Sequence, residues 1–186
     1  MNPMQKILVR ASSRTYPVYI GENILAQLPH LWEVQEHKGF LIADNRLPET
    51  SQQLVDVLKK SGWEVTLLEV EVTESFKDLE SLYPIYGQML QAGMNRQSTL
   101  LALGGGVIGD AVGFIASTYL RGIPWIGLPT TLLAQVDSSI GGKTAVNHSL
   151  GKNLIGTFHQ PALVLCDTIL LRSLPAREVL SGFGEV

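Results

Sequence analysis

The sequence predicts an α/β fold of Rossmann-like type, a mostly parallel sheet with helices on both faces. Short apolar runs with strand character alternate with longer amphipathic runs, and turn residues separate them. One of these strands, residues 99–103, ends in the consecutive glycines at positions 104–106, and a helix is expected directly after them. Such a turn binds phosphate groups, because glycine lets the backbone approach closely and the helix N-terminus presents free N–H groups.

The first elements are two short strands and a buried one. Residues 7–9 and 17–20 are expected to form an edge pair, and residues 39–43 a strand that leads into an acidic residue. Residues 48–61 are amphipathic and predict a helix, which Gly62 ends.

The second half of the predicted fold repeats the strand–helix unit. Residues 76–92 predict a helix that Pro84 begins or kinks, and residues 107–120 predict the helix after the glycines. Because the connections are βα units, ligands are expected at the carboxyl ends of the strands. The remaining strands are predicted at residues 65–68, 125–128 and 162–166.

Composition excludes several classes of function. The chain has 186 residues, 45% of them apolar, and a net charge of −3, which argues against a general nucleic-acid binder. Its only cysteine, Cys166, fits a reducing compartment. The longest uncharged apolar run, residues 122–136, contains two prolines and does not predict a membrane span. We expect a cytoplasmic protein with neither a membrane nor a nucleic acid as partner.

Isolated charges indicate where a site lies. Between residues 97 and 142 only Asp110, Arg121 and Asp137 are charged, and an isolated charge in an apolar segment is costly to bury without a partner or a task. Asp110 falls in the first turn of the predicted helix, where a carboxylate stabilises the helix or accepts bonds from a ribose or a ring amide. Arg121 is equally compatible with a surface position at a helix end.

Two lysines predict a second anion site. Lys143 and Lys152 follow glycine-rich stretches, residues 138–142 and 151, in what we expect to be loops. Ammonium groups with hydroxyl and amide neighbours bind phosphate oxygens. The alternative is a pair of solvated lysines.

Three familiar motifs do not fit. A P-loop ending at Lys143 would need glycine where the chain has Asp137. The G-x-G-x-x-G spacing of the glycines at 104, 106 and 109 follows a late strand, and the acid suited to a ribose, Asp44, precedes it. The histidines lack metal-ligand spacing and are expected at loop or surface positions; they are His30, His37, His148 and His159.

Longer segments resemble the 3-dehydroquinate synthase family of sugar-phosphate cyclases. The resemblance is carried by GGGVIGD at 104–110, PTTLLAQVDSSIGGKTAVN at 129–147, GKNLIG at 151–156, and LPARE and GEV at 174–178 and 184–186. It runs in register over the whole chain, and the block from 129 to 156 is the most specific part.

The resemblance implies a fold, an activity and an organisation. Family enzymes bind NAD and a divalent metal, Zn²⁺ or Co²⁺, and convert 3-deoxy-D-arabino-heptulosonate 7-phosphate to 3-dehydroquinate and phosphate in the shikimate pathway, as homodimers. It implies an NAD-binding domain over residues 1–174 and the start of a metal- and substrate-binding domain over 175–186. We therefore expect this chain to bind NAD and to be inactive alone. The alternatives are another sugar-phosphate cyclase and a noncatalytic NAD-binding module.

Site residues follow from the same resemblance, position by position. Contacts to the substrate fall on Asp137, Lys143 and Asn153, with Arg121 reaching the phosphate in a neighbouring subunit, and Glu185 is the first metal ligand. The family usually has Pro-x-Gly-Glu-x-x-Lys where this chain has Glu71 and Thr73 in place of the proline and glycine. The NAD-binding positions are Asp44, Glu74, Lys77, Gly105, Gly106, Val107, Ile108, Gly109, Asp110, Thr130, Thr131, Lys143, Lys152, Leu170, Leu171, Arg172 and Ser173.

Overall fold

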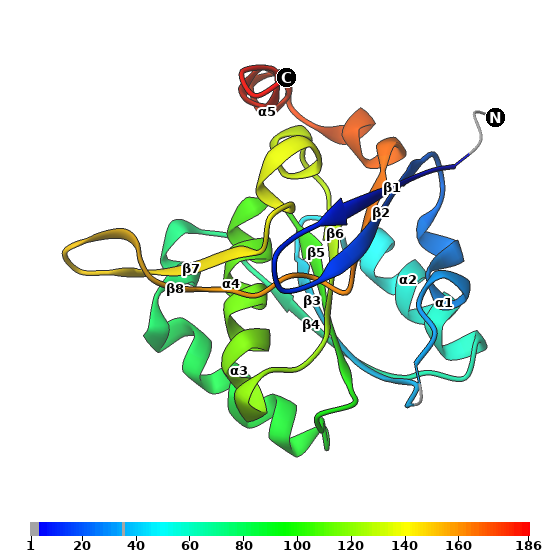
Figure 1. Ribbon diagram of the computed structural model, residues 1–186, viewed down its shortest axis with the longest axis vertical. Helices are drawn as coiled ribbons and strands as arrows, with labels where there is room; N and C mark the ends of the chain where they lie inside the picture. Colours follow the sequence, from blue (N-terminus) through cyan, green and yellow to red (C-terminus); the bar gives the residue numbers. More distant parts are fainter. Residues whose placement is uncertain (1–3, 35) are drawn as a thin grey trace.

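The computed structural model describes residues 4–34 and 36–186, which are built around a seven-stranded sheet. The strand order is β1-β2-β9-β6-β5-β3-β4 (Figure 1). Neighbouring strands are parallel except for β1 and β2, which form an antiparallel pair at one edge, as predicted. The strands are β1 (Gln5–Arg10), β2 (Thr15–Gly21), β3 (Lys38–Asp44), β4 (Glu64–Val70), β5 (Thr99–Gly104), β6 (Trp125–Pro129) and β9 (Leu163–Asp167).

Helices cover both faces of this sheet, which confirms the predicted class. Helices α3 and α4 lie on one face, and α1 and α2 lie on the other (Figure 1). A short helix, α5, follows β9 and stands apart from the sheet. No helix within the described ranges is long and apolar enough to cross a membrane. The helices are α1 (Leu28–Leu31), α2 (Pro48–Lys60), α3 (Leu79–Gln91), α4 (Gly106–Thr118) and α5 (Ala176–Phe183), and the shorter turns are η1 (Leu25–Gln27), η2 (Glu74–Lys77), η3 (Tyr119–Arg121), η4 (Ala134–Ser138) and η5 (Thr168–Ser173).

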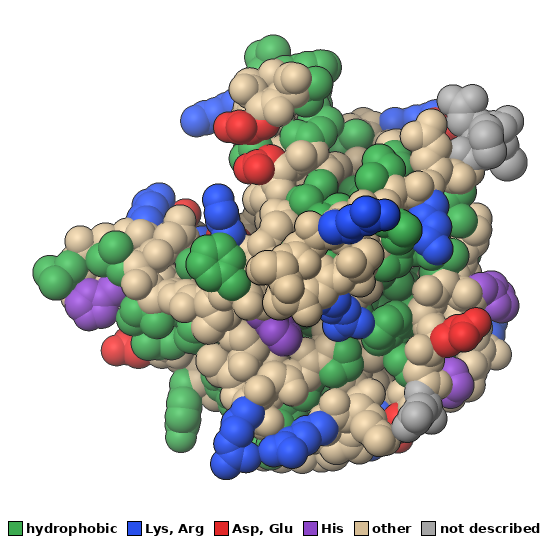
Figure 2. All heavy atoms as spheres, in the orientation of Figure 1, with side chains coloured by type: hydrophobic (Ala, Val, Ile, Leu, Met, Phe, Trp, Pro, Cys, Tyr) green, Lys and Arg blue, Asp and Glu red, His purple; other side chains and the backbone are tan. Residues whose placement is uncertain are grey.

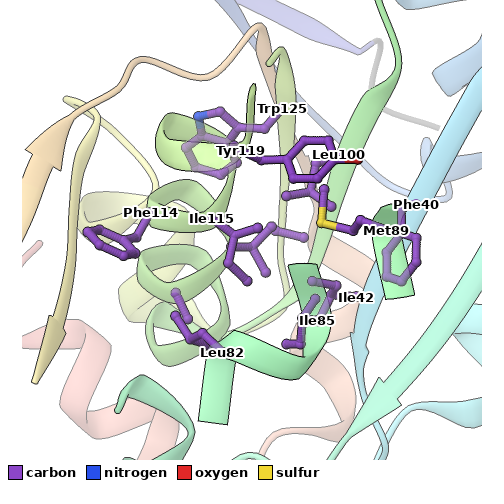
Figure 3. Packing of buried hydrophobic residues seen from close by; sticks show 14 of the residues in the cluster. Phe40, Ile42, Leu82, Ile85, Met89, Leu100, Phe114, Ile115, Tyr119 and Trp125 are labelled. Atoms are coloured by element: carbon purple, nitrogen blue, oxygen red, sulfur yellow. The ribbon is translucent and has the colours of Figure 1, made fainter. Parts of the chain in front are cut away.

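The core beneath α3 and α4 holds the glycine-bearing strand in place. Side chains of Phe40 and Ile42 from β3 meet Met89 of α3 and Ile115 of α4 (Figure 3). All six residues of β5 are buried, because this strand is central and has helices on both sides. The β5–α4 turn is thus fixed by packing at both of its ends.

The end of α2 is the predicted glycine stop. Gly62 has φ +84°, its N–H donates to the carbonyl of Lys59, and the N–H of Trp63 donates to the carbonyl of Leu58. These two bonds make a Schellman motif, in which glycine relieves the steric cost of the left-handed residue.

The helix predicted over residues 76–92 begins later than expected. Residues Glu74–Lys77 form the separate turn η2, and α3 starts at Leu79. Pro84 lies inside α3 and does not start it. Pro84 is exposed, as is Glu80 four residues earlier, whose carbonyl has no N–H partner there, so water can reach this side of the helix.

Helix α4 ends two residues earlier than predicted. After Thr118 the chain makes the turn η3, in which Leu120 and Arg121 have φ +49° and +70°. Left-handed backbone is uncommon for residues with a Cβ and interrupts the helical hydrogen bonds. Gly122, with φ +117°, then leads into β6.

The expectation that Lys143 and Lys152 lie in loops is wrong. They belong to β7 (Lys143–His148) and β8 (Gly151–Phe158), an antiparallel hairpin that projects as an arm from the body (Figure 1). Thr144 and Val146 of β7 are buried, and β7 packs against α4, whereas most of β8 is exposed. Exposure on both faces removes the alternating pattern that reveals a strand in a sequence.

Close packing of α4 against the arm depends on Gly113. A Cβ added there would lie 2.4 Å from Cγ2 of Thr144 and 3.2 Å from the Trp125 ring. Gly113→Ala is therefore expected to lower the free energy of unfolding by about 1–3 kcal/mol, measured by urea denaturation. Gly109→Ala, in the same helix with no atom within 4 Å of the added Cβ, is the matched control and should raise stability by up to about 1 kcal/mol. Equal effects of the two changes would contradict the packing argument.

Candidate functional site

The carboxyl ends of three adjacent strands form one edge of the sheet. Asp44 ends β3, Gly104 ends β5 and Pro129 ends β6, and the register pairs Ala43 with Leu103 and Gly104 with Pro129. The connection after β3 leads outward to β4, and the connection after β5 leads the other way to β6. Strands whose connections diverge define a switch point, which is where open α/β sheets bind ligands.

The glycine turn at this edge leaves no room for side chains. A Cβ on Gly104 would lie 2.6 Å from Ile108, one on Gly105 3.0 Å from Thr131, and one on Gly106 3.0 Å from the Ser138 hydroxyl. Gly105 is the N-cap of α4 and gives it no side-chain hydrogen bond. The N-terminus of α4 therefore keeps its backbone N–H groups for another partner.

Two hydroxyl groups face the same turn. In the described part of the chain, Oγ of Ser138 and of Ser139 are buried and have no hydrogen-bond partner. Both serines line a small pocket together with the glycines of the turn. The pocket has a volume of about 10 Å³, so it has room for about one water beside these hydroxyls and not for a phosphate group.

The other predicted residues of this edge support the turn. The N–H of Thr130 donates to the carbonyl of Gly104 at 3.0 Å, and Oγ1 of Thr131 accepts the N–H of Ala134 at 3.2 Å. The side chain of Ile108 is fully buried in the core, so only its backbone belongs to the turn. Gly109 and Val107 complete the first turn of α4.

A buried lysine connects this turn to the arm. Lys77 of η2 is 4% exposed, and its Nζ donates to Oδ2 of Asp110 at 2.6 Å and to Oδ1 of Asn153 at 2.5 Å. A lysine this buried needs such partners, because an unpaired ammonium is very costly to remove from water. Burial raises the pKa of Asp110, and the bond from Lys77 opposes that rise.

A second polar contact ties η2 to the arm at its surface. Glu74 forms an ion pair with Lys152 at 3.4 Å and accepts a bond from Nδ2 of Asn147 at 3.0 Å. The Asn147 amide is the main cause of a lowered pKa at Glu74. Asn147 also accepts the N–H of Asn153, so it fixes that residue's backbone. Asn147 was not predicted as a site residue, although it ends a segment that carries the family resemblance.

The departure from the family's Pro-x-Gly pattern does not disturb this cluster. Thr73, where the family usually has glycine, has φ −115° and ψ 164°, an extended conformation open to any residue. Glu74 and Lys77 therefore keep their contacts without the glycine.

A cleft of about 500 Å³ brings together four of the predicted residues. It lies between α4, η4 and the arm, and Figure 2 shows this face hollowed between the arm and the C-terminal segment. Its charged and polar lining includes Asp110, Asp137, Lys143 and Asn153. The cleft thus brings together residues from three of the segments that carry the resemblance, 104–110, 129–147 and 151–156.

The turn before Lys143 is held by two residues far away in the sequence. The hydroxyl of Tyr16 accepts the N–H of Gly141 at 2.9 Å, and Nε2 of Gln160 donates to the carbonyl of Gly141 at 2.8 Å. A Cβ on Gly142, which has φ +67°, would lie 2.6 Å from the Gln160 amide. Neither supporting residue was predicted from the sequence, because Tyr16 and Gln160 lie 125 and 19 residues from Gly141 and no local pattern links such positions.

Asp44 is not a free carboxylate. It is 2% exposed and accepts three contacts from the Arg46 guanidinium, at 2.9 and 3.0 Å from Nε and 2.5 Å from Nη2. Arg46 was also missed, since a neighbouring arginine predicts no particular side-chain orientation.

Residues 170–173 lie in η5, after β9. Leu170 and Ser173 line a second cavity of about 580 Å³, whose other wall is α2. Arg172 pairs with Glu22 at 3.2 Å. This turn is positioned by Asp167, which accepts backbone N–H groups from residues 23–25 and 169. The cavity opens at the same sheet edge as the glycine turn, beside the end of β9.

Two predicted site residues, Arg121 and Glu185, lie away from the glycine turn and from the contacts of Lys77. Arg121 is exposed beyond the C-terminus of α4, a helix of thirteen residues and so about 20 Å from the glycine turn. Glu185 is exposed after α5. No group of three or more His, Cys, Asp or Glu side chains that could hold a metal occurs in residues 4–34 and 36–186.

A mostly parallel sheet with a glycine turn at its switch point and an acid on the adjacent strand defines a Rossmann-like domain. The family model described as 3-dehydroquinate synthase N-terminal matches residues 67–181. The chain belongs to this family.

Curated 3-dehydroquinate synthases are similar to this chain in sequence. A 3-dehydroquinate synthase of Desulforamulus reducens is 44% identical over 186 residues, which cover 98% of this chain and 52% of that protein. The chain thus spans about half the length of the curated relatives it matches.

Solved structures of related cyclases have the same fold. A 2-deoxy-scyllo-inosose synthase complexed with carbaglucose-6-phosphate, NAD⁺ and Co²⁺ matches with a TM-score of 0.90 and 29% identity, over 96% of this chain and 49% of that one. A 2-epi-5-epi-valiolone synthase from Streptomyces hygroscopicus subsp. jinggangensis, with NAD⁺ and Zn²⁺ bound, matches with a TM-score of 0.82 and 31% identity, over 94% and 49%.

The Lys77 contacts are expected to contribute measurably to stability. Lys77→Met leaves Asp110 and Asn153 without their donor, and we expect the free energy of unfolding to fall by about 1–3 kcal/mol at pH 7 in urea denaturation. Lys152→Met, which removes only the exposed pair with Glu74, should cost less than about 1 kcal/mol.

The pH dependence of the same variant provides a second test. The raised pKa of Asp110 means that the folded state holds its proton more tightly than the unfolded state. Its ionisation therefore lowers stability as pH rises through the ordinary value of 3.8 and upward. Lys77→Met should raise that pKa further and steepen the loss between about pH 4 and 7. A pH profile parallel to that of the parent chain would contradict a direct Lys77–Asp110 interaction.

Proposed function

We propose that the chain is the NAD-binding part of a 3-dehydroquinate synthase, the enzyme that converts 3-deoxy-D-arabino-heptulosonate 7-phosphate to 3-dehydroquinate and phosphate. The observation that carries the proposal is the glycine turn at the N-terminus of α4, where no side chain caps the free backbone N–H groups. Family membership and an identity near 45% to enzymes of that name support it. NAD⁺ and a divalent metal are bound in the two cyclase structures compared above, which supports the cofactors.

In this proposal, different residues of the chain bind different parts of the NAD cofactor. The backbone of residues 105–109 and the N-terminus of α4 bind the pyrophosphate. Ser138 and Ser139 line the small pocket beside this turn. Asp110 uses Oδ2 for Lys77, which leaves Oδ1 for the cofactor. The remaining contacts are assigned to Asp44, Glu74, Thr130, Thr131, Lys143, Lys152 and residues 170–173.

The cleft is assigned to the sugar phosphate. Because Oδ1 of Asn153 accepts from Lys77, its Nδ2 group is turned to donate to a ligand oxygen. Lys143 supplies a positive charge from a turn fixed by Tyr16 and Gln160, and Asp137 accepts hydroxyl protons from the sugar. Bound NAD⁺ supplies a reversible hydride acceptor for a substrate alcohol, while these residues orient that alcohol and the phosphate.

Four parts of the proposal lie beyond the cleft itself. The domain boundary is placed near residue 174, and Glu185 contributes one carboxylate to a Zn²⁺ or Co²⁺ site whose other ligands come from outside these residues. Arg121, at the end of α4 away from the glycine turn of its own chain, reaches the phosphate held by a second copy in a homodimer. The protein is assigned to the cytoplasm.

Another sugar-phosphate cyclase is the second candidate. A TM-score of 0.90 to 2-deoxy-scyllo-inosose synthase means that the fold alone does not separate these enzymes. Identity favours 3-dehydroquinate synthase, with 44% against 29%.

NAD⁺ binding tests the proposal directly. In thermal unfolding of this chain, NAD⁺ at about one hundred times its dissociation constant should add roughly 2.7 kcal/mol of stability. Gly106→Ala should abolish most of the shift, because the added Cβ fills the space beside the Ser138 hydroxyl. Gly87→Ala, in α3 with open space around the added Cβ, should leave it intact.

Turnover gives the second test. The 186-residue chain, supplied with NAD⁺, Zn²⁺ and 3-deoxy-D-arabino-heptulosonate 7-phosphate, should release no phosphate, since the described residues form no metal site. Phosphate release would be followed colorimetrically, and 3-dehydroquinate by chromatography. Formation of 3-dehydroquinate by this chain alone would falsify the proposed division of the site.

A further inference from the structure

The Asp44–Arg46 pair lies where a dinucleotide's adenosine ribose is selected. In Rossmann-like domains an acid at the end of the strand next to the glycine strand binds the ribose 2′-hydroxyl and disfavours a 2′-phosphate. Asp44 occupies this position, one strand from Gly104. Its side chain is 4% exposed, whereas that of Arg46 is 69% exposed.

The Asp44 carboxylate already has most of its acceptor sites in use. Two oxygens offer about four lone-pair positions. Three contacts from the Arg46 side chain and one from the Arg46 N–H, at 3.0 Å, engage both oxygens. Two hydroxyls of a ribose would have to compete for them, and the adjacent guanidinium offsets the charge that repels a phosphate.

The guanidinium retains donors for a ligand. Of the five N–H groups of an arginine, Asp44 uses the single one on Nε, shared between its two oxygens, and one on Nη2. Three N–H groups remain, and the side chain is mostly open to solvent. Arginine binds phosphate oxygens through such paired donors. The pair therefore presents cationic donors where an unpaired Asp44 would present only negative charge.

We propose that Arg46 determines the ribose specificity of this site, and that through Arg46 the chain accepts a 2′-phosphorylated dinucleotide, NADP⁺, as well as NAD⁺. This inference rests on the proposed function, because it assumes that the glycine turn binds the pyrophosphate. The competing explanation is that the pair only stabilises the turn between β3 and α2, where the N–H of Leu47 also donates to the carbonyl of Asp44.

Calorimetric titration of the chain with NAD⁺ and with NADP⁺ separates these explanations. The parent chain should bind the two with dissociation constants within about tenfold of each other. Arg46→Ala should weaken NADP⁺ binding by about tenfold or more and NAD⁺ binding by less than about threefold. Arg46→Lys, which keeps the charge but not the paired donors, should give an NADP⁺ dissociation constant between those of the parent chain and of Arg46→Ala. Arg96→Ala is the matched control, since Arg96 is exposed before β5 at the opposite edge of the sheet.

The outcomes distinguish the two proposals. If NAD⁺ binds and NADP⁺ is more than about a hundredfold weaker in the parent chain, the Arg46 inference is overturned and the proposed function stands. An equal loss of both nucleotides in Arg46→Ala also overturns it, in favour of a role in the turn alone. If neither nucleotide binds to the folded parent chain, both proposals fail. The ratio of the NADP⁺ and NAD⁺ dissociation constants of the parent chain tests the Arg46 inference even if Arg46→Ala does not fold.

Discussion

The buried ammonium of Lys77 is the contact on which the arrangement of the site depends. It joins η2 to the first turn of α4 through Asp110 and to the arm through Asn153. A lysine 4% exposed is stable there only while both partners stay in place, because its desolvation is repaid by those bonds. The same two bonds orient Asp110 beside the glycine turn and the Asn153 amide beside the cleft. Stability and the geometry of the proposed site therefore rest on one interaction.

Close backbone approach provides the second constraint, and it acts along the length of α4. Gly106 allows the turn to meet Ser138, and Gly113 allows the helix to meet Thr144 of the arm. At Gly156 an added Cβ would lie 2.4 Å from the carbonyl of Thr144, so the two strands of the arm also depend on a missing side chain. These contacts set the width of the cleft between α4 and the arm, because larger residues would push its walls apart.

Local patterns predicted most of the fold, and contacts between distant residues account for what they missed. A few neighbouring residues are enough to predict each of three features: the edge strands, the helix end at Gly62 and the β5–α4 turn. The arm was mistaken for loops because β8 is exposed at most positions and shows no alternation. The supports of the Lys143 turn, Tyr16 and Gln160, depend on tertiary contacts that no spacing rule reveals. Predicted roles such as metal binding by Glu185 remain predictions, since side chains outside the described residues would have to complete them.

The order of strands in space, rather than along the chain, explains why the usual dinucleotide fingerprint does not match. That fingerprint expects an acid about 20 residues after the glycines, on the next strand. Here the acid, Asp44, precedes Gly104 in the sequence, yet β3 and β5 are hydrogen-bonded neighbours in the same register. The physical requirement is an acid one strand away from the helix N-terminus, and a permuted chain order satisfies it equally well. The residues that would tune the proposed ribose site are then those around the end of β3, where Arg46 contacts Asp44.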